Sequence, residues 1–291
     1  MRADHRQGAA ADALFEVRRP SGVAVPLVLD SPHSGTWYPE DFAPCQPPER
    51  YRRAEDMYVD ALFSAAPDLG CPLFAARFAR IYCDVNRAPD DLAPDALADP
   101  DGLTLAPSAK ARLGKGVIWT ATPPDGAPLL ARKLARAEYE ARLARFWHPY
   151  HAALADLLAE ARARTGAAYH LDLHSMQPVA NSMHEDATGS RRPDIVLSDR
   201  EGTSCGPDFL AAAHAALCDL GFDIAINDPF KGAEILRRHG DPRGGVHSLQ
   251  VEVNRALYMD VETYEKTADF DATRDRLTRF VARMRDWVAA R

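Results

Sequence analysis

The chain has 291 residues, 46% of them hydrophobic and 26% charged, which is an ordinary balance for a globular protein with a substantial core. Its net charge of −7 argues against nucleic acid or an anionic membrane surface as the main partner. The five cysteines form no C-x-x-C pair and no apolar run approaches the roughly 20 residues of a membrane span, so we expect a reduced, cytoplasmic protein, either a monomer or a small homo-oligomer.

Short apolar runs alternate with longer stretches of strong helix formers, which predicts an α/β fold. The expected strands are Val25–Leu29, Pro72–Ala76, Arg80–Val85, Ala168–Leu173, Asp194–Leu197, Asp223–Ile226 and Ser248–Val253. The expected helices are Pro48–Ala66, Ala131–Arg164, Pro207–Leu220 and Glu262–Ala289, with a kink or break at Pro149 and a stop at Gly166. Ala88–Lys110 and Met176–Pro193 lack periodicity and are expected to be long loops. No linker composition divides the chain, so we expect one domain over residues 1–291.

Two of the apolar runs end in a histidine, namely V-P-L-V-L-D-S-P-H-S-G and A-Y-H-L-D-L-H-S. Buried parallel strands read as continuous apolar runs, and ligands bind beyond the carboxyl ends of such strands. We therefore expect His33 and His174 to lie side by side at one edge of a sheet. Two histidines and a carboxylate are the usual ligands of a catalytic zinc, with one position left open.

The second run carries three polar residues at alternate positions, His170, Asp172 and His174. Strand side chains alternate with period two, so all three point to one face, while Leu171 and Leu173 point to the other. The position at the strand end favours His174 as a ligand, Asp172 as its orienting partner and His170 as a core residue. An alternative, in which H-x-D-x-H forms a metal site of its own, remains open.

The third ligand is expected in R-R-A-E-D-M-Y-V-D, within the predicted helix after the His33 loop. The candidates are Glu55, Asp56 and Asp60. Asp56 and Asp60 share a helical face by their i,i+4 spacing, and Glu55 points elsewhere. Spacing alone does not choose among the three, and a solvated helix face is the alternative for each.

Two matching tetrapeptides follow predicted strands, D-V-N-R at 84–87 and E-V-N-R at 252–255. Arginine presents a rigid fork that binds carboxylates. Glu252 lies between two valines, where a buried carboxylate needs a role, and it could act as the general base toward water. The alternative is a buried Glu–Arg ion pair. In the glycine- and arginine-rich stretch Lys231–Val246, Arg243 is either an anion contact or part of a solvated loop.

Taken in order, these motifs resemble the N-formylglutamate amidohydrolase family. The quoted stretches are P-H-S-G, E-D-M-Y-V-D, C-D-V-N-R-A-P, L-D-L-H-S and K-G-A-E-I-L-R-R-H-G-D-P-R-G-G-V-H-S-L-Q-V-E-V-N-R-A-L-Y-M, from about Val25 to Met259. The family is similar in fold to zinc carboxypeptidases and succinylglutamate desuccinylase, which implies a central mixed, largely parallel sheet flanked by helices (phosphorylase/hydrolase-like). The resemblance implies a zinc held by His33, Asp56 and His174.

The resemblance also implies roles for the polar residues around that zinc. Glu252 looks like the catalytic glutamate, Asn86 and Arg87 resemble the pair that grips a substrate carboxylate, and Arg255 and Arg243 would help with a second one. We therefore expect zinc-dependent hydrolysis of a small anionic N-acyl amino acid, N-formyl-L-glutamate first, to formate and L-glutamate, with Arg87 near the oxyanion.

Two alternatives stay open at this point. Ala88–Thr122 departs from what a histidine-pathway deformylase would show, which leaves another N-acyl amino acid as the substrate of a related zinc-dependent deacylase or peptidase. The alternative of a different class is a metal-free protein that binds an acidic metabolite through its arginines.

Overall fold

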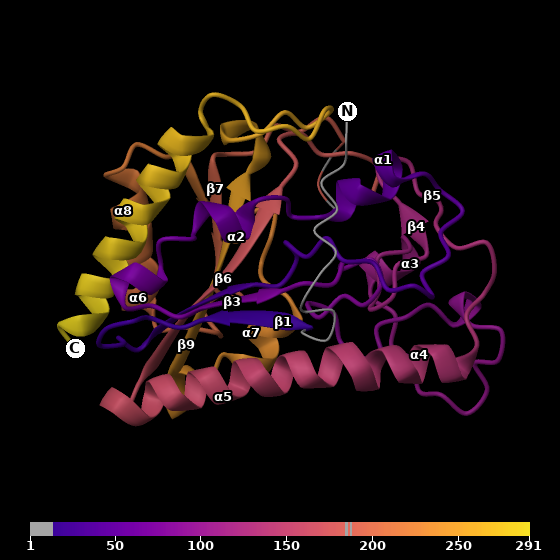
Figure 1. Cartoon of the computed structure of the whole chain (residues 1–291), viewed down its shortest axis with the longest axis horizontal. Helices are drawn as coiled ribbons and strands as arrows, with labels where there is room; N and C mark the ends of the chain where they lie inside the picture. Colours follow the sequence, from indigo (N-terminus) through magenta and orange to yellow (C-terminus); the bar gives the residue numbers. More distant parts are fainter. Residues whose placement is uncertain (1–13, 184–185, 187) are drawn as a thin grey trace.

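The computed structural model describes residues 14–183, 186 and 188–291, and within them a seven-stranded sheet forms the centre of the molecule (Figure 1). Its strands are β1 (Phe15–Arg18), β2 (Leu27–Ser31), β3 (Leu73–Ala76), β6 (Ala168–Met176), β7 (Ile195–Ser198), β8 (Ile224–Ile226) and β9 (Val246–Asn254). The strand order is β1-β3-β2-β6-β9-β7-β8. The β1–β3 and β9–β7 pairs are antiparallel and the other four are parallel, so the predicted mixed, largely parallel sheet is confirmed.

Helices cover both faces of this sheet. They are α1 (Pro48–Tyr51), α2 (Val59–Leu62), α3 (Ala109–Arg112), α4 (Arg136–Arg142), α5 (His148–Thr165), α6 (Pro207–Cys218), α7 (Glu234–His239) and α8 (Phe270–Ala289). Helix α5 packs on β2 and β6 from one side, whereas α6 and α8 pack together on the other (Figure 1). A short hairpin of β4 (Ala121–Thr122) and β5 (Ala127–Pro128) lies apart from the main sheet.

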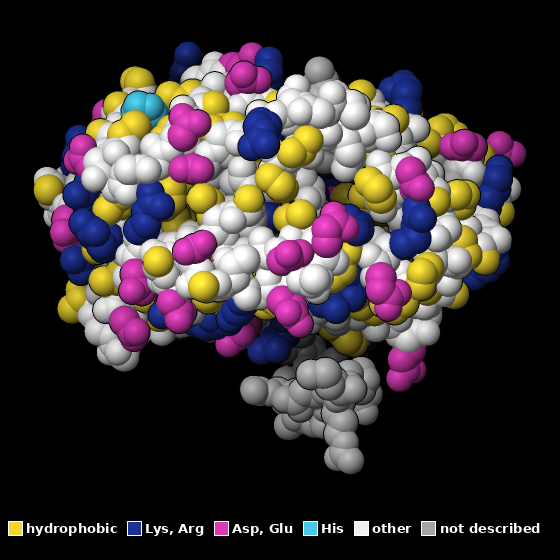
Figure 2. Space-filling view, turned by 90° about the horizontal axis from the view of Figure 1, so that it is seen from above, with side chains coloured by type: hydrophobic (Ala, Val, Ile, Leu, Met, Phe, Trp, Pro, Cys, Tyr) yellow, Lys and Arg dark blue, Asp and Glu magenta, His cyan; other side chains and the backbone are white. Residues whose placement is uncertain are grey.

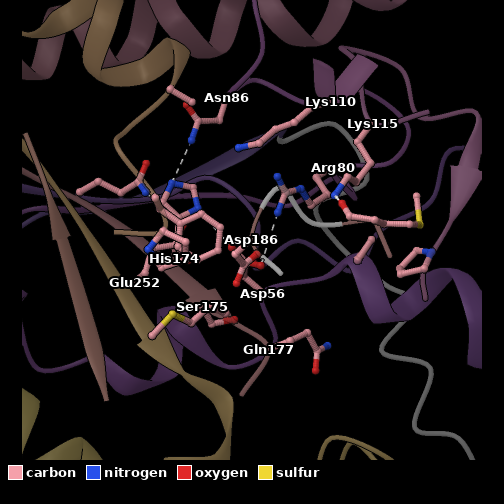
Figure 3. A pocket seen from close by; sticks show the side chains of 18 of the residues that line it. Asp56, Arg80, Asn86, Lys110, Lys115, His174, Ser175, Gln177, Asp186 and Glu252 are labelled. Atoms are coloured by element: carbon pink, nitrogen blue, oxygen red, sulfur yellow. Dashed lines mark hydrogen bonds and ion pairs between the residues drawn. The ribbon is translucent and has the colours of Figure 1, made fainter. Parts of the chain in front are cut away.

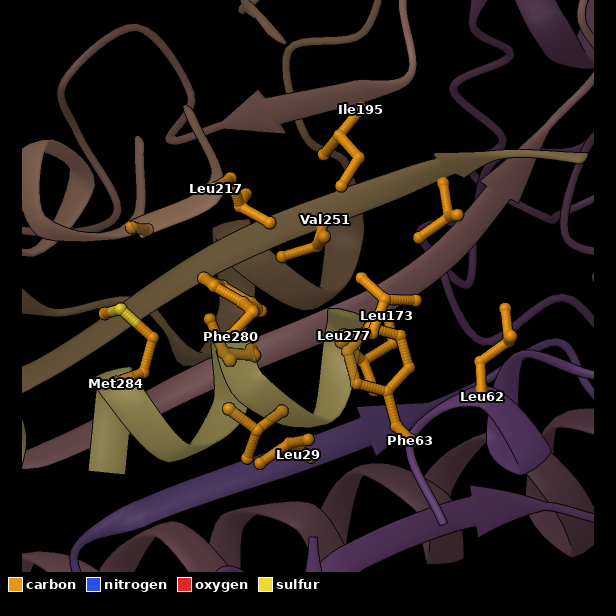
Figure 4. Close-up of a cluster of buried hydrophobic side chains, with 14 of the residues drawn as sticks. Leu29, Leu62, Phe63, Leu173, Ile195, Leu217, Val251, Leu277, Phe280 and Met284 are labelled. Atoms are coloured by element: carbon orange, nitrogen blue, oxygen red, sulfur yellow. The ribbon is translucent and has the colours of Figure 1, made fainter. Parts of the chain in front are cut away.

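The alternation along β6 places polar and apolar residues on opposite faces of the sheet, as predicted. Leu171 and Leu173 belong to the hydrophobic core that α6 and α8 cover, together with Leu29 and Val251 of the neighbouring strands (Figure 4). The polar residues of β6 face the α5 side, where Asp172 pairs in register with Asp30 of β2. A second hydrophobic core, between the sheet and α5, includes Val28, Phe74 and Ala168, so the polar residues of β6 are buried beside it.

The predicted helix Pro48–Ala66 is wrong as one element. The chain forms α1, a 3₁₀ turn at Arg52–Ala54, an extended Glu55, and then α2, with Tyr58 in the left-handed region at φ 66°. The physical reason lies at Asp56, whose backbone N–H donates to the carbonyl of His33 at 2.9 Å instead of to a helical carbonyl. This bond pulls Asp56 out of a helix and toward the end of β2.

The predicted strand Arg80–Val85 is also wrong, because these residues form turns beyond the end of β3. The Asp84 carboxylate accepts hydrogen bonds from the Arg80 guanidinium, at 2.9 and 3.1 Å, and from the backbone N–H of Asn86 at 2.9 Å. Such local side-chain bonds compete with a strand ladder. They hold the segment next to the carboxyl ends of the strands.

The predicted helix Ala131–Arg164 is interrupted near the expected place. A π-helical turn over Leu143–Trp147 separates α4 from α5, and Pro149 occupies the first turn of α5. Proline lacks the N–H that a helix interior needs, so a local change of hydrogen bonding at this point is expected. Gly166 ends α5 in the left-handed region, at φ 86°, which confirms the predicted stop. The last helix, α8, begins at Phe270 instead of Glu262, and β1, β4, β5, α3 and α7 were not predicted.

The described residues contain no helix with the length and apolar character that a membrane span requires. On the face of the molecule seen in Figure 2, Lys and Arg side chains alternate with Asp and Glu side chains. That face therefore presents no surface of a single charge.

Gly35, in the loop after β2, is required by a close approach of two backbone segments. A Cβ there would lie 2.3 Å from the Phe78 carbonyl oxygen and 2.7 Å from that of Arg77. We expect Gly35→Ala to lower the free energy of unfolding by about 1–3 kcal/mol, because backbone atoms cannot swing aside as side chains do. Urea unfolding measures this loss. Gly22→Ala is the control, since nothing lies within 4 Å of its Cβ, and equal stability of the two variants would contradict the account.

A histidine pair formed by His151 of α5 and His239, the last residue of α7, makes the fold sensitive to acid. His151 donates from Nε2 to the Val85 carbonyl at 2.9 Å, so its Nδ1 accepts from His239 Nε2, also at 2.9 Å. Burial lowers the pKa of His151 to about 3 and that of His239 to about 2. Below about pH 6.5 the unfolded chain binds protons that the folded chain does not, so stability falls as the pH falls through that value.

Thermal unfolding between pH 7.5 and 5 measures this effect. We expect His239→Gln to show a shallower loss of melting temperature with acid than the parent chain. The control is His214→Gln, at a half-buried histidine of α6, and it should keep the parental slope. If the melting temperature of His239→Gln falls with acid as steeply as that of the parent chain, the histidine pair does not cause the acid sensitivity.

Candidate active site

Three buried side chains converge beyond the carboxyl ends of β2 and β6. His33 Nδ1 lies 3.1 Å from His174 Nδ1, and Asp56 Oδ2 lies 3.4 Å and 3.1 Å from these two nitrogens. None of the three residues is more than 2% exposed. A tetrahedral zinc with bonds of 2.0–2.1 Å separates its ligand atoms by about 3.3 Å. The three side chains therefore fit a metal ion between them.

The outer nitrogen of each histidine faces a carboxylate. His33 Nε2 lies 2.8 Å from Asp84 Oδ1, and His174 Nε2 lies 2.9 Å from Asp172 Oδ1. With a metal bound, the Nε2 protons would lie on these sides, because each carboxylate is buried and can only accept. In that state both Nδ1 atoms would be free to coordinate a metal beside Asp56. Metal-binding histidines are oriented by carboxylates in this way, and Asp172 takes the position that the sequence predicted for it.

The electrostatics of the cluster favour a positive charge between its three members. Burial alone would raise the pKa of Asp56, but hydrogen bonds from His174 and His33 and the charge of Arg80 hold that pKa well below its usual value. Burial lowers the pKa of His174, and the carboxylates of Asp172 and Asp56 outweigh this effect and raise it well above 6.5. The chain thus stabilises a cation at this place.

Glu252 adjoins the cluster from the next strand. It pairs in register with His174 across β6 and β9, and the two side chains lie near each other in Figure 3. The Oε1 atom of Glu252 accepts from Gln250 Nε2 at 3.0 Å. Burial raises the pKa of Glu252, and the charge of Asp56 adds to the increase. The structure forms no ion pair between Glu252 and an arginine among its described residues, so the alternative of a buried Glu–Arg pair does not hold.

A cavity of about 490 Å³ opens in front of these residues (Figure 3). Asp56, His174 and Glu252 line it on the side of the sheet. Among the charged residues of its lining, the cationic Arg53, Arg80, Arg87, Lys110, Lys115, Arg192, Lys231 and Arg255 outnumber the acidic Asp56, Asp186 and Glu252. A cavity with this excess of positive charge suits an anionic ligand.

The comparisons with known proteins agree with this geometry. The family model of N-formylglutamate amidohydrolase matches residues 25–259, the span over which the sequence motifs occur. The chain belongs to this family.

Three known proteins match this chain over most of its length. It is 31% identical over 270 residues to the N-formylglutamate deformylase of Pseudomonas aeruginosa, spanning 90% of this chain and 94% of that protein. It is 30% identical to the deformylase of Pseudomonas putida, over 81% of this chain and 82% of that one. A crystal structure of N-formylglutamate amidohydrolase from Ralstonia eutropha JMP134 superposes with a TM-score of 0.90 at 41% identity, over 96% and 99% of the two chains. These matches make the chain an amidohydrolase of a known enzyme family.

Of the three acidic candidates, the structure brings only Asp56 to the histidines. Glu55 is buried but turns away, and accepts from Tyr38 Oη at 2.5 Å and from Arg52. Asp60 lies near the surface, 3.3 Å from Arg18. The helical face that Asp56 and Asp60 were predicted to share does not exist, because Asp56 precedes α2.

The two arginines proposed for a second carboxylate are placed differently from the prediction. Arg243 is exposed before the start of β9 and does not line the cavity. Glu252 lies near the opposite end of that strand, about 20 Å away at 3.3 Å per residue. Arg255 does reach the cavity, but its guanidinium is held by Ser175, two backbone carbonyls and Asp56.

Asn86 and Arg87 both line the cavity. Asn86 Nδ2 lies 3.1 Å from His174 Nε2, and its Oδ1 accepts from the backbone N–H of Ile235 at 2.9 Å. Arg87 donates from Nε to the carbonyl of Lys115 and from Nη1 to that of Asn86. Asn86 thus joins the first turn of α7 to the site.

Sequence reasoning did not assign roles to Asp84, Arg80 and Trp119. Asp84 orients His33, and its other oxygen accepts from Arg80 and, at 3.1 Å, from Trp119 Nε1. The D-V-N-R repeat was a usable signal for Asp84, since its partner motif begins with Glu252. Trp119 lies far along the chain, and no local pattern marks it.

Proposed function

We propose that this chain is a zinc-dependent amidohydrolase that acts on N-acyl amino acids with an acidic side chain, with N-formyl-L-glutamate as its substrate. The observation that carries the proposal is the convergence of two imidazole nitrogens and a carboxylate oxygen beside the buried Glu252, at the wall of a cavity rich in cationic residues. The names of the Pseudomonas relatives support the substrate. The whole chain would act as one metallohydrolase domain.

His33, Asp56 and His174 would hold the zinc. When bound there, it supplies a Lewis acid that makes water nucleophilic near neutral pH. Glu252 takes the proton from the attacking water and later donates it to the leaving amine, a task that suits a carboxylate with a raised pKa. The water oxygen joins the formyl carbon and the C–N bond breaks, which gives formate and the free amino acid.

The cationic walls would bind and orient the substrate. Asn86 and Arg87, which line the cavity, would hold a substrate carboxylate, and Arg87 would also contribute positive potential near the developing oxyanion. Arg80 adds a second guanidinium beside Asp56. A substrate with two carboxylates gains from this excess of cations, whereas a neutral N-formyl amino acid gains less.

Formate release from N-formyl-L-glutamate by the purified protein tests the proposal. We expect turnover that a strong chelator abolishes and that added zinc restores. N-formyl-L-leucine is the matched substrate, and it should be hydrolysed much more slowly because it lacks the second carboxylate. Equal rates on both substrates, or no chelator-sensitive formate release, would contradict the proposal.

A further inference from the structure

The two oxygens of the Asp56 carboxylate have different surroundings. Oδ2 faces the Nδ1 atoms of His33 and His174. Oδ1 points the other way and accepts from Arg255 Nη2 at 3.0 Å, with Arg80 Nη1 at 3.5 Å. One oxygen is thus directed into the cluster and the other is engaged by cations behind it.

Arg255 is a buried connector and not an open binding group. It is 5% exposed, and its Nε donates to Ser175 Oγ at 3.0 Å. Its Nη1 donates to the Arg53 carbonyl at 3.0 Å, and its Nη2 to the Glu55 carbonyl at 2.6 Å as well as to Asp56. These bonds use four of the five N–H donors of the guanidinium. They fix the segment that carries Asp56 against the residue that follows His174 in β6.

Arg80 connects the same carboxylate to the other histidine. Its Nε and Nη2 donate to Asp84 Oδ2 at 3.1 and 2.9 Å, and Asp84 orients His33 through its remaining oxygen. The guanidinium also lies over the Trp119 ring, 5.2 Å from the centroid, which limits its movement. Asp56 Oδ1 is therefore bordered by two arginines that are themselves anchored by other groups.

We infer that Arg255, assisted by Arg80, is a positioning residue that keeps Asp56 a one-oxygen metal ligand. The inference rests on the proposed metal centre. With Oδ1 engaged by guanidinium N–H groups, only Oδ2 is available to the metal, which leaves a coordination position open. Catalytic zinc sites depend on such an open position. Without Arg255, Asp56 can rotate and offer both oxygens, which raises the coordination number and displaces water.

Cobalt(II) substitution tests this assignment without relying on turnover. The metal-free protein, Arg255→Gln and the control Arg243→Gln are each titrated with cobalt(II), and both affinity and visible absorption are recorded. We expect Arg255→Gln to bind cobalt about 10–100-fold more weakly, as is typical when an outer partner of a ligand is lost. We also expect its absorption to weaken, because cobalt(II) absorbs less strongly as its coordination number rises. Arg243→Gln, at an exposed residue outside the cavity, should match the parent protein.

Arg255→Lys is the second variant, in case Arg255→Gln does not fold, since lysine keeps a positive charge on a side chain of similar length. Thermal unfolding of each metal-free variant identifies any that do not fold. We expect the lysine variant to recover part of the cobalt affinity and part of the absorption, because one ammonium can still reach Oδ1 but cannot hold all four acceptors. If Arg255→Gln and Arg255→Lys keep the parental affinity and spectrum, the inference is overturned and the metal centre stands. If the parent protein itself binds no cobalt, both are overturned.

Discussion

Glu252→Gln keeps the metal and loses catalysis. We expect turnover of N-formyl-L-glutamate to fall on the order of 10³-fold, within the range of about 10²–10⁴ that a positioned general base contributes. Glutamine has the shape of glutamate and can still bond with Gln250, but it cannot accept a proton from water at neutral pH. Because Glu252 is not one of the three converging groups, the bound metal should stay at the parental level.

Steady-state kinetics with parallel metal analysis measures both parts of this prediction. We expect kcat to fall while KM changes little, since Glu252 acts on the reacting water and not on the substrate carboxylates. Gln250→Ala is the comparison, because it removes the neighbouring side chain and its hydrogen bond but keeps the Glu252 carboxylate, and it should retain most activity. Turnover of Glu252→Gln within tenfold of the parent would remove Glu252 from the role of base.

Asp56→Asn abolishes metal binding, whereas the same change at Glu55 or Asp60 does not. Replacing the carboxylate by an amide removes the negative charge that faces both histidines, and it leaves Arg255 and Arg80 beside a neutral group. We expect a loss of metal affinity greater than the 10–100-fold that outer partners contribute. Activity should fall in parallel and should not return at micromolar zinc.

Glu55→Gln and Asp60→Asn are the matched controls for this prediction. Each is a carboxylate-to-amide change within five residues of Asp56, in a side chain that points elsewhere. Both variants should bind about one metal ion per chain. If Asp60→Asn or Glu55→Gln loses the metal while Asp56→Asn keeps it, the acidic ligand has been assigned to the wrong residue.

The positions of the two histidines follow from the sequence because strands have a simple geometry. A continuous apolar run ending in His33 or His174 predicts a buried parallel strand, and parallel strands bring their carboxyl ends to one edge. Period-two alternation likewise predicts the face of Asp172 and Glu252, and the structure places both on the side of the site. These inferences use only the strand period and the direction of the chain.

The acidic ligand could not be placed by such reasoning. Helical spacing groups Asp56 with Asp60, but a tertiary hydrogen bond from the Asp56 N–H to His33 overrides the local preference and breaks the helix. Only the resemblance to the family selected Asp56. A long-range bond of this kind leaves no periodic signal in the surrounding residues.

Arginine roles were the least predictable part of the site. Arg243 and Arg255 lie in the same family motif. Arg243 is exposed just before the start of β9, whereas Arg255 follows the end of β9 and donates to backbone carbonyls and to Asp56. Sequence shows that a guanidinium is present but not how many of its donors are already used. Arg80 illustrates the converse, since it fell in a predicted strand that does not form and lies instead between two carboxylates.

Metal analysis of the purified protein tests the central claim most directly. The protein is purified without added metal or chelator, then dialysed against excess zinc, and its zinc content is measured by plasma mass spectrometry beside that of His174→Ala. We predict about one zinc per parent chain and almost none in the variant. A parent chain that holds no zinc after dialysis, or a His174→Ala chain that holds as much as the parent, would contradict the metal centre at His33, Asp56 and His174.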